Sequence, residues 1–319
     1  MALLGGNPST QGIKLDLKTT TSVFEPGNLS VSCIRVETSN IASPPKPLLI
    51  VITPTIQGTY PVLLFLHGFE LRNTFYTQLL QLISSHGFIV VAPQLYGLLP
   101  PSGIQEIESA AAVTNWLSSG LQSVLPENVK PDLLKLALSG HSRGGKTAFA
   151  LALGYADTSL NFSALLGLDP VGGSSKCCQT DPKILTYVPH CFNLAIPVCV
   201  IGTGLGDEPM NHLRPCAPDG VNHVEFVSEC KPPCSHFVTT EYGHLDMLDD
   251  HLSGFIGAIS GYICKSGKGP RDPMRRCVGG LFVAFLKAYL KGQSGDFKAV
   301  VDAPDLAPVK LDPVEFIEA

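Results

Sequence analysis

Residues 134–155 read LKLALSGHSRGGKTAFALALGY. Residues 134–139, which are mostly apolar, predict a β-strand, and residues 146–155 predict a helix. Between them, Gly140 and Gly144 have no side chains and let the strand and the helix approach closely around Ser142. A strand, a tight glycine turn and a helix form the context in which a serine is held out from a sheet for chemistry. We therefore predict that Ser142 is a catalytic nucleophile and that Gly140 and Gly144 form its elbow.

The chain around this stretch alternates between short β-rich runs and longer helical patterns. This alternation predicts an α/β fold with a mostly parallel central sheet and helices on both faces. The other expected strands are residues 31–36, 48–52, 62–66, 89–92, 164–168, 197–201 and 236–240. The other expected helices are residues 74–85, 104–121 and 278–291.

The length and the 45% hydrophobic content favour one globular unit. We expect an extended lead-in over residues 1–46, a catalytic domain over residues 47–295, and a Pro-rich tail over residues 296–319. Residues 171–195 and 202–229 interrupt the alternation. Long insertions beside the carboxyl ends of parallel strands commonly build a pocket or its lid, so we expect these two segments over the active site.

The composition argues against several classes of protein. The formal net charge is −5 and the Lys and Arg residues are scattered, so we expect no nucleic-acid partner. No apolar run approaches the roughly 20 residues that span a bilayer. No basic segment followed by an apolar one marks a secretory signal in the first thirty residues. Asp16 and Glu25 also fit poorly with an acidic-poor plastid transit sequence.

The ten cysteines do not have the spacing of a familiar zinc site. Cys177 and Cys178 are adjacent, and Cys230-Lys-Pro-Pro-Cys234 stands without a second pair. We therefore expect no metal. Disulfide bonds are possible, with the pairing left open, among Cys177, Cys178, Cys191, Cys216, Cys230 and Cys234.

A serine hydroxyl is a weak nucleophile until a base accepts its proton. His244 follows the last expected strand, where the base of such a fold is expected, and is our candidate. We expect His141, inside the elbow, to point away from the nucleophile. The remaining histidines are out of place by chain order or lie in turns and at helix ends.

Two acidic residues compete to orient the histidine. Asp169 directly follows the strand at residues 164–168, and Asp207 follows the next strand along the chain. Both positions lie at the carboxyl ends of neighbouring strands, so either side chain could reach His244. Spacing alone leaves this choice open.

Acyl transfer also requires two donors aimed at the developing oxyanion, usually backbone N–H groups. We predict the amide of Arg143, which follows the nucleophile, as the first donor. The second is expected from the His67-Gly68-Phe69 turn that follows the strand at residues 62–66, where Phe69 would supply its amide.

Several longer stretches resemble the plant chlorophyllase family, with a likeness that extends from about residue 47 to residue 291. The most specific are FLHGF (65–69), SSHGF (84–88), APQLY (92–96), SGHSRGGKTAFA (139–150), DPV (169–171), PCAP (215–218), NH (222–223) and YGHLDMLDD (242–250). The resemblance implies an α/β-hydrolase fold and cleavage of the phytyl ester of chlorophyll by water, giving chlorophyllide and phytol. It also implies Ser142, Asp169 and His244 as the catalytic triad, with Asp207 as the alternative acid.

The resemblance implies no protein cofactor, because the magnesium of chlorophyll belongs to the substrate. It implies a chloroplast location, with the cytosol, the vacuole and the endoplasmic reticulum as alternatives. Two other functions stay open: an esterase or phospholipase of the same fold that acts on another acyl chain, and a ligand receptor on a non-catalytic hydrolase fold.

A phytyl chain binds best along apolar walls. We therefore assign Leu71, Tyr96, Leu98 and Leu99 to a substrate cleft, as residues on loops after the strands that flank the site. Leu98 and Leu99 could equally anchor their loop in the core. If they are exposed, residues 98–101 could dip into a membrane, which suggests peripheral membrane association.

Overall fold

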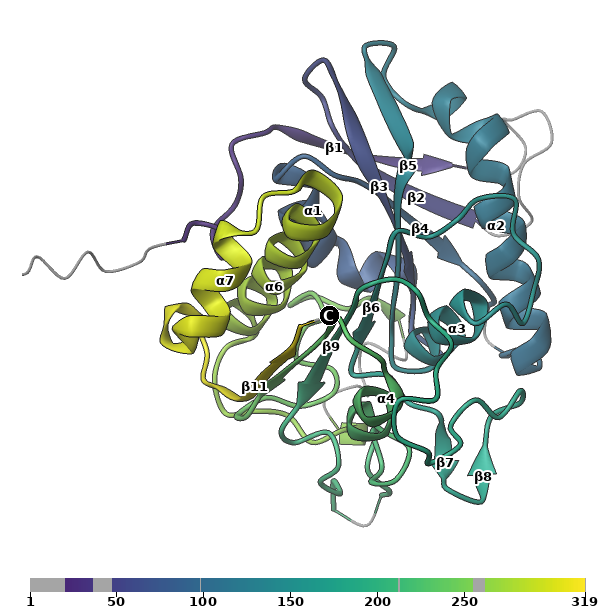
Figure 1. Cartoon of the computed structure of the whole chain (residues 1–319), viewed down its shortest axis with the longest axis vertical. Coiled ribbons are helices and arrows are strands. Elements are labelled where there is room, and N and C mark those ends of the chain that lie inside the picture. The colour runs from purple at the N-terminus through teal and green to yellow at the C-terminus, as the bar shows by residue number, and fades with distance from the viewer. Residues whose placement is uncertain (1–20, 37–47, 98, 212, 255–261, 319) are drawn as a thin grey trace, which may run out of the picture.

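A nine-stranded sheet forms the centre of the computed structural model, which describes residues 21–36, 48–97, 99–211, 213–254 and 262–318 (Figure 1). The strand order is β1-β2-β4-β3-β5-β6-β9-β10-β11, and the six strands from β4 to β10 in this order run parallel. These strands are β1 (Val31–Val36), β2 (Leu48–Pro54), β3 (Gly58–Leu66), β4 (Ile89–Gln94), β5 (Val129–His141), β6 (Ala164–Leu168), β9 (Val198–Thr203), β10 (Cys234–Thr239) and β11 (Leu311–Ile317). A separate small hairpin joins β7 (Gly173–Ser175) to β8 (Cys178–Gln179).

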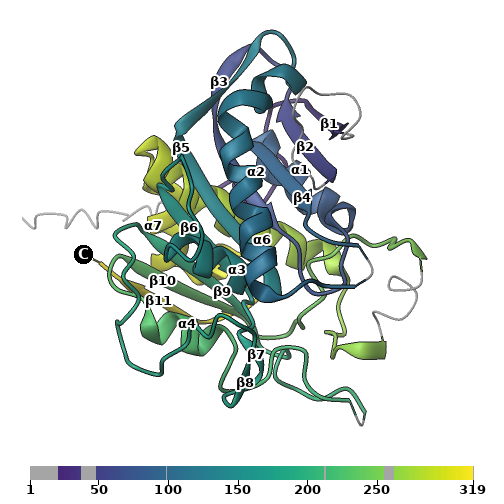
Figure 2. The ribbon, with the colours of Figure 1, turned by 90° about the vertical axis from the view of Figure 1, so that its right-hand side faces the viewer.

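Helices cover both faces of the sheet (Figure 2). On one face lie α1 (Thr77–Ser85), α6 (Arg271–Lys291) and α7 (Gly295–Asp302). On the other lie α2 (Gly103–Val124), α3 (Arg143–Ala152) and α4 (His223–Glu229). Two short 3-10 helices are η1 (Asn73–Tyr76) and η2 (Pro304–Leu306). The predicted α/β class, with helices on both faces of a mostly parallel sheet, is confirmed.

The apolar character of β3 reflects burial on both sides. Leu63 and Phe65 pack into the core under α1 and α6, whereas Leu64 and Leu66 pack into the core under α2 and α3. Successive side chains of a strand point to opposite faces, so a strand with a helix layer on each face needs a continuous apolar run. This is why the sequence shows unbroken hydrophobic runs here and no polar alternation.

The C-terminal segment differs from the expected tail. Residues 296–319 contain most of α7 and all of β11, and β11 pairs antiparallel with β10. His236–Thr240 is therefore not the last strand, and the sheet extends beyond residue 295. The prolines that suggested a tail are compatible with this position: Pro313 lies in an edge strand, where a missing N–H breaks no ladder.

Two other elements begin at residues that differ from the predicted ones. Helix α6 begins at Arg271 and not at residue 278, and β5 begins at Val129 and not at residue 134. At the N-terminal side, β1 pairs antiparallel with β2, so the lead-in contributes a strand to the sheet. Within the described residues, no helix combines the length and the apolarity that crossing a bilayer requires.

The strand register places the functional candidates at one edge of the sheet. His141 at the end of β5 is aligned with Leu168 of β6, and Leu168 is aligned with Ile201 of β9. Ser142 and Asp169 follow directly after the two aligned positions. Because parallel strands end at the same edge, residues that are distant in sequence meet there.

Candidate active site

Ser142 has the strained backbone of an elbow. Its φ is 56° and its ψ is −125°, a conformation that L-residues rarely adopt. A Cβ added to Gly140 would lie 2.2 Å from the carbonyl oxygen of Gly144, and one added to Gly144 would lie 2.3 Å from that of His67. Only glycine fits at either position, because the turn is pressed against the end of β3. The turn therefore holds Ser142 between the end of β5 and the start of α3.

Ser142, His244 and Asp169 form one hydrogen-bonded chain. Nε2 of His244 lies 2.8 Å from Oγ of Ser142, and Nδ1 lies 2.6 Å from Oδ2 of Asp169. Since a carboxylate only accepts, Nδ1 carries the proton and Nε2 is free to accept the hydrogen of the serine hydroxyl. Asp169 is completely buried, and only 7% of Ser142 is exposed. This arrangement lets a histidine remove a proton from a serine that a substrate can still reach.

The environment of Asp169 keeps this carboxylate charged. Burial alone would raise its pKa, but hydrogen bonds from His244 and Thr203 and the nearby His223 outweigh burial and lower the pKa below its usual value. Thr203 donates its hydroxyl to Oδ2 over 2.6 Å and its amide to Oδ1 over 3.3 Å. An ionised acid at this position accepts the Nδ1–H of His244 and so fixes the tautomer and the orientation of the ring.

Asp207, the rival acid, lies elsewhere. Its side chain is exposed and lines a separate cavity together with His223 and His236. Of the two aspartates, the structure brings only Asp169 into hydrogen-bonding contact with His244.

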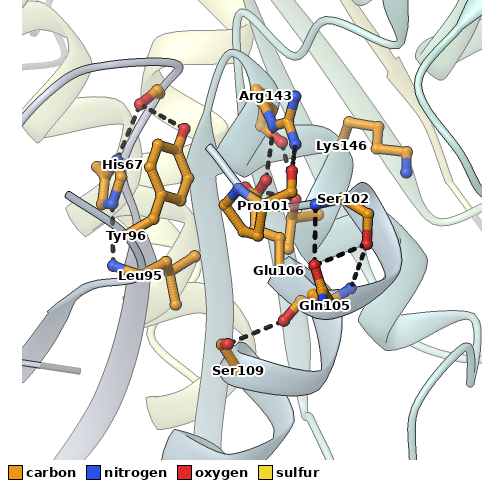
Figure 3. Close-up of polar contacts among 12 residues, drawn as sticks. His67, Leu95, Tyr96, Pro101, Ser102, Gln105, Glu106, Ser109, Arg143 and Lys146 are labelled. Carbon is orange, nitrogen blue, oxygen red and sulfur yellow. Dashed lines mark hydrogen bonds and ion pairs between the residues drawn. The ribbon is translucent and has the colours of Figure 1, made fainter. Parts of the chain in front are cut away.

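The turn after β3 is held through the carbonyl of Gly68. This oxygen accepts from Nδ1 of His67 (2.8 Å), the amide of Leu71 (3.2 Å) and the hydroxyl of Tyr96 (3.4 Å). Figure 3 shows the rings of His67 and Tyr96 next to each other, and their centres are 4.9 Å apart. In a trans peptide the C=O and the following N–H point in opposite directions, so the Phe69 amide faces away from these three donors. Phe69 itself lines the cavity beside Ser142.

His67 is a neutral part of this turn. Its Nε2 accepts from the amide of Leu95 (3.0 Å), which leaves the ring proton on Nδ1 for Gly68 (Figure 3). Burial lowers the pKa of His67 to about 4, although the hydrogen bond to Gly68 opposes this. The ring is therefore uncharged at neutral pH and serves to orient the turn.

The side chain of Arg143 joins three segments around the site. Its Nε donates to the buried carboxylate of Glu106 over 2.6 Å, and its Nη2 donates to the carbonyl of Pro101 over 2.8 Å (Figure 3). The guanidinium also lies 5.9 Å from the centre of the Phe69 ring. Arg143 is the first residue of α3, so its amide has no partner within that helix. Both predicted oxyanion donors thus belong to residues that contact each other at the cavity.

A cavity of about 360 Å³ opens beside Ser142. The inserted segments supply most of its wall, as expected, with Val171, Gln179 and Pro215 among the lining residues. One wall residue, Cys216, forms a disulfide bond with Cys264. Cys264 is not one of the six cysteines for which the sequence suggests a disulfide bond, because nothing in its sequence context distinguishes it. Of those six, the other five are free thiols.

The four residues assigned to the substrate cleft differ in their positions. Leu71 is buried in the core under α1, and Tyr96 is buried against the Gly68 turn; neither is among the residues that line the cavity. Leu99 is 82% exposed, which excludes a role as a core anchor. Leu98 lies outside the described residues.

The expectation that His141 points away from the site is wrong. Its Nε2 lies 2.9 Å from the carbonyl oxygen of His244, and the two rings are 4.6 Å apart between centres. The sequence offered no signal for this contact, because it joins two loops that are far apart along the chain.

Among the described residues, no group of three His, Cys, Asp or Glu side chains is placed to hold a metal ion.

The parallel sheet, the glycine-flanked serine turn at the end of β5 and the histidine after β10 define the α/β-hydrolase class. Comparison with known proteins specifies the family. The model of the chlorophyllase family matches residues 19–318, and the chain belongs to this family.

Curated relatives match over nearly their whole length. The chain is 50% identical over 304 residues to Chlorophyllase-1 of Arabidopsis thaliana, covering 94% of each chain. It is 50% identical over 315 residues to "Chlorophyllase-1, chloroplastic" of Citrus unshiu, covering 98% of this chain and 93% of the relative. It is also 50% identical over 295 residues to Chlorophyllase-2 of Arabidopsis thaliana, covering 90% of this chain and 92% of the relative.

Proposed function

We propose that this chain hydrolyses the phytyl ester of chlorophyll to chlorophyllide and phytol through an acyl-enzyme intermediate. The hydrogen-bonded chain of Ser142, His244 and Asp169, in a member of the chlorophyllase family, carries this proposal. The same chemistry on another acyl ester is the alternative.

The first half of the reaction forms the acyl-enzyme. His244 accepts the proton of Ser142 through Nε2 while Oγ attacks the ester carbonyl. The buried Asp169 stabilises the charge that His244 gains. The amides of Phe69 and Arg143 hold the oxyanion of the tetrahedral intermediate. When the intermediate collapses, the ester C–O bond breaks and phytol leaves with the proton from His244.

The second half releases the acid. Water enters the site, loses its proton to His244 and attacks the acyl carbonyl. The bond to Ser142 then breaks, the serine recovers its proton from His244, and chlorophyllide leaves. Every proton is carried by groups of this chain.

The test compares two esters and two serine variants. Wild-type protein is incubated with chlorophyll a and with p-nitrophenyl butyrate, and chlorophyllide and nitrophenol are measured. We expect chlorophyllide from the wild type, none above background from Ser142→Ala, and normal activity from Ser109→Ala, whose hydroxyl donates to a backbone carbonyl within α2. If only the short ester were hydrolysed, the substrate would be another acyl ester and not chlorophyll. Activity in Ser142→Ala would contradict the mechanism.

We also propose a chloroplast location and contact with the membrane that holds the pigment. Two exposed apolar side chains support such contact: Phe69 at the wall of the cavity, and Leu99 on the loop whose Pro101 carbonyl is held by Arg143. Vesicles of plastid galactolipids should bind the wild type more strongly than Leu99→Asp. Leu134→Asp is the control, because Leu134 is 90% exposed but lies on β5 away from the cavity. Equal binding of all three proteins would contradict membrane contact by this loop, and imaging a tagged protein tests the location.

A further inference from the structure

A buried hydrogen-bonded chain connects the turn after β3 to the loop of the catalytic base. The amide of Gly68 lies 3.1 Å from Oη of Tyr76, and this oxygen lies 2.7 Å from Nδ1 of His141. On the other side of its ring, Nε2 of His141 lies 2.9 Å from the carbonyl oxygen of His244. Tyr76 and His141 are completely buried. Neither side chain has a role in the reaction as proposed above.

The groups at the two ends of this hydrogen-bonded chain determine which atom is the donor in each of its hydrogen bonds. The Gly68 amide can only donate, so Tyr76 accepts from it; the His244 carbonyl can only accept, so Nε2 of His141 carries a proton. Burial, with the neighbouring His244, lowers the pKa of His141 far below its usual value, so its ring is neutral. Nδ1 is then a bare acceptor, and the Tyr76 hydroxyl donates to it. The donors all run in one direction, an arrangement in which each bond strengthens the next.

The positions of these groups leave little freedom. A Cβ on Gly68 would lie 3.0 Å from Nδ1 of His141 and 3.1 Å from Cβ of Ser142, so the turn is packed directly against both residues. The other side of the same turn is held by His67 and Tyr96 at the Gly68 carbonyl. Misplacing a catalytic group by a fraction of an ångström can cost a large part of the rate.

We propose that Tyr76 and His141 are positioning residues that hold the oxyanion turn and the backbone of His244 in fixed relation to Ser142. They touch neither the substrate nor the transferred proton. This inference rests on the proposed roles of Ser142 and His244, and it adds the device that keeps donor and base aligned as charge develops.

Two variants of His141 separate its two hydrogen bonds. The amide nitrogen of Gln can occupy the place of Nε2, so His141→Gln keeps a donor for the His244 carbonyl. The amide oxygen of Asn can occupy the place of Nδ1, so His141→Asn keeps the acceptor for Tyr76 but loses that donor. We expect kcat to fall about tenfold or more in His141→Asn, with KM within about twofold, and to recover in part in His141→Gln, which keeps the donor for His244 but lacks the acceptor for Tyr76. Equal kcat values in the two variants would contradict the proposal.

Removal of the Tyr76 hydroxyl tests the part of the hydrogen-bonded chain that joins Gly68 to His141. Tyr76→Phe should lower kcat by about tenfold with little change in KM, and combining it with His141→Asn should cost little more than the larger single loss, because both act through one chain. Tyr60→Phe is the control, since its hydroxyl donates to the carbonyl of Ile56 away from the site. Multiplicative losses, or kcat within twofold in folded Tyr76→Phe, would overturn the proposal.

Labelling by a fluorophosphonate provides a second readout. This probe requires the serine, the base and the oxyanion donors but not chlorophyll, so its rate should fall in parallel with kcat in the same variants. Thermal melting gives the folded fraction by which each rate is corrected. If the wild type reacts with the probe but not with chlorophyll, the proposed substrate is wrong while the positioning role is still tested. A normal labelling rate in folded His141→Asn would count against the positioning role.

Discussion

The hydroxyl of Thr203 donates to Oδ2 of Asp169 across 2.6 Å, and this same oxygen accepts the hydrogen bond of His244. Thr203 is the last residue of β9, and Asp169 follows the last residue of the neighbouring strand β6. The sheet register therefore brings a donor to the acid from a second strand. The shared oxygen makes the orientation of the carboxylate depend on both partners.

Thr203→Val should impair catalysis without removing any group that touches the substrate. A hydrogen bond to a charged group contributes about 1.5–3 kcal/mol, so kcat should fall by roughly tenfold or more while KM changes little. The pKa of Asp169 should rise, because one of the interactions that lower it is lost. Thr239→Val is the matched control: Thr239 is the aligned residue of β10, equally buried, and donates to the Gly202 carbonyl. Comparable losses of kcat in the two folded variants would show that the hydrogen bond from Thr203 to Asp169 has no specific role in catalysis.

The two aspartates that the sequence could not separate should differ strongly. Asp169→Asn replaces the acceptor of the His244 Nδ1–H by a group that can favour the wrong tautomer, and kcat should fall by about 10⁴-fold. Asp207→Asn changes an exposed side chain and should leave kcat within about twofold. Steady-state rates on chlorophyll a decide the matter. A large loss in Asp207→Asn together with a small one in Asp169→Asn would reverse the assignment.

Glu106→Gln should destabilise the protein. Glu106 is buried on α2 and accepts from Arg143 and from the hydroxyl of Thr147. Burial raises the pKa of this carboxyl, and Arg143 and Thr147 oppose the rise. Replacing the carboxylate leaves the guanidinium without its counter-charge, and the free energy of unfolding should fall by about 2 kcal/mol or more.

Urea unfolding of Glu106→Gln at pH 7 measures this loss. Glu108→Gln, an exposed change on the same helix, provides the control and should alter the free energy of unfolding by less than about 0.5 kcal/mol. The same loss in both variants would mean that the Arg143 contact contributes nothing specific.

Stability should decrease as the pH falls below about 6.5. Burial lowers the pKa of His67 to about 4 in the folded protein, whereas an unfolded histidine has a pKa of about 6.5. Between these values the unfolded chain binds more protons, so the free energy of unfolding drops by up to about 1.4 kcal/mol per pH unit for this one group. His141 is shifted in the same direction and adds to the effect.

Urea unfolding between pH 7.5 and pH 4.5 tests this prediction. His67→Gln should reduce the slope of stability against pH by close to one proton, whatever its effect on absolute stability. Asn161→Gln, an exposed change between two residues that do not titrate, should leave the slope unchanged. An unchanged slope in His67→Gln would show that His67 does not titrate as its burial implies.

Local pattern was sufficient to predict much of the molecule. Unbroken apolar runs such as residues 62–66 identified the strands, since a strand buried on both faces carries its signal in consecutive residues. Gly140 and Gly144 identified the elbow, since no other residue fits there. The C-terminal strand was missed because its prolines and its mixed exposure resemble a loop, and only the free edge of β10 makes the pairing favourable.

The sequence by itself determined the fold class, the glycine-flanked turn at Ser142 and the order along the chain of the residues proposed to act with it, because these depend on local periodicity and on glycines at fixed spacing. Only the tertiary structure decided which aspartate meets His244, which cysteine bonds to Cys216, and that His141 lies under the base loop. Each of these is a contact across loops that end different strands. Its distance depends on sheet register and on side-chain direction, and neither is encoded in the residues that surround either partner.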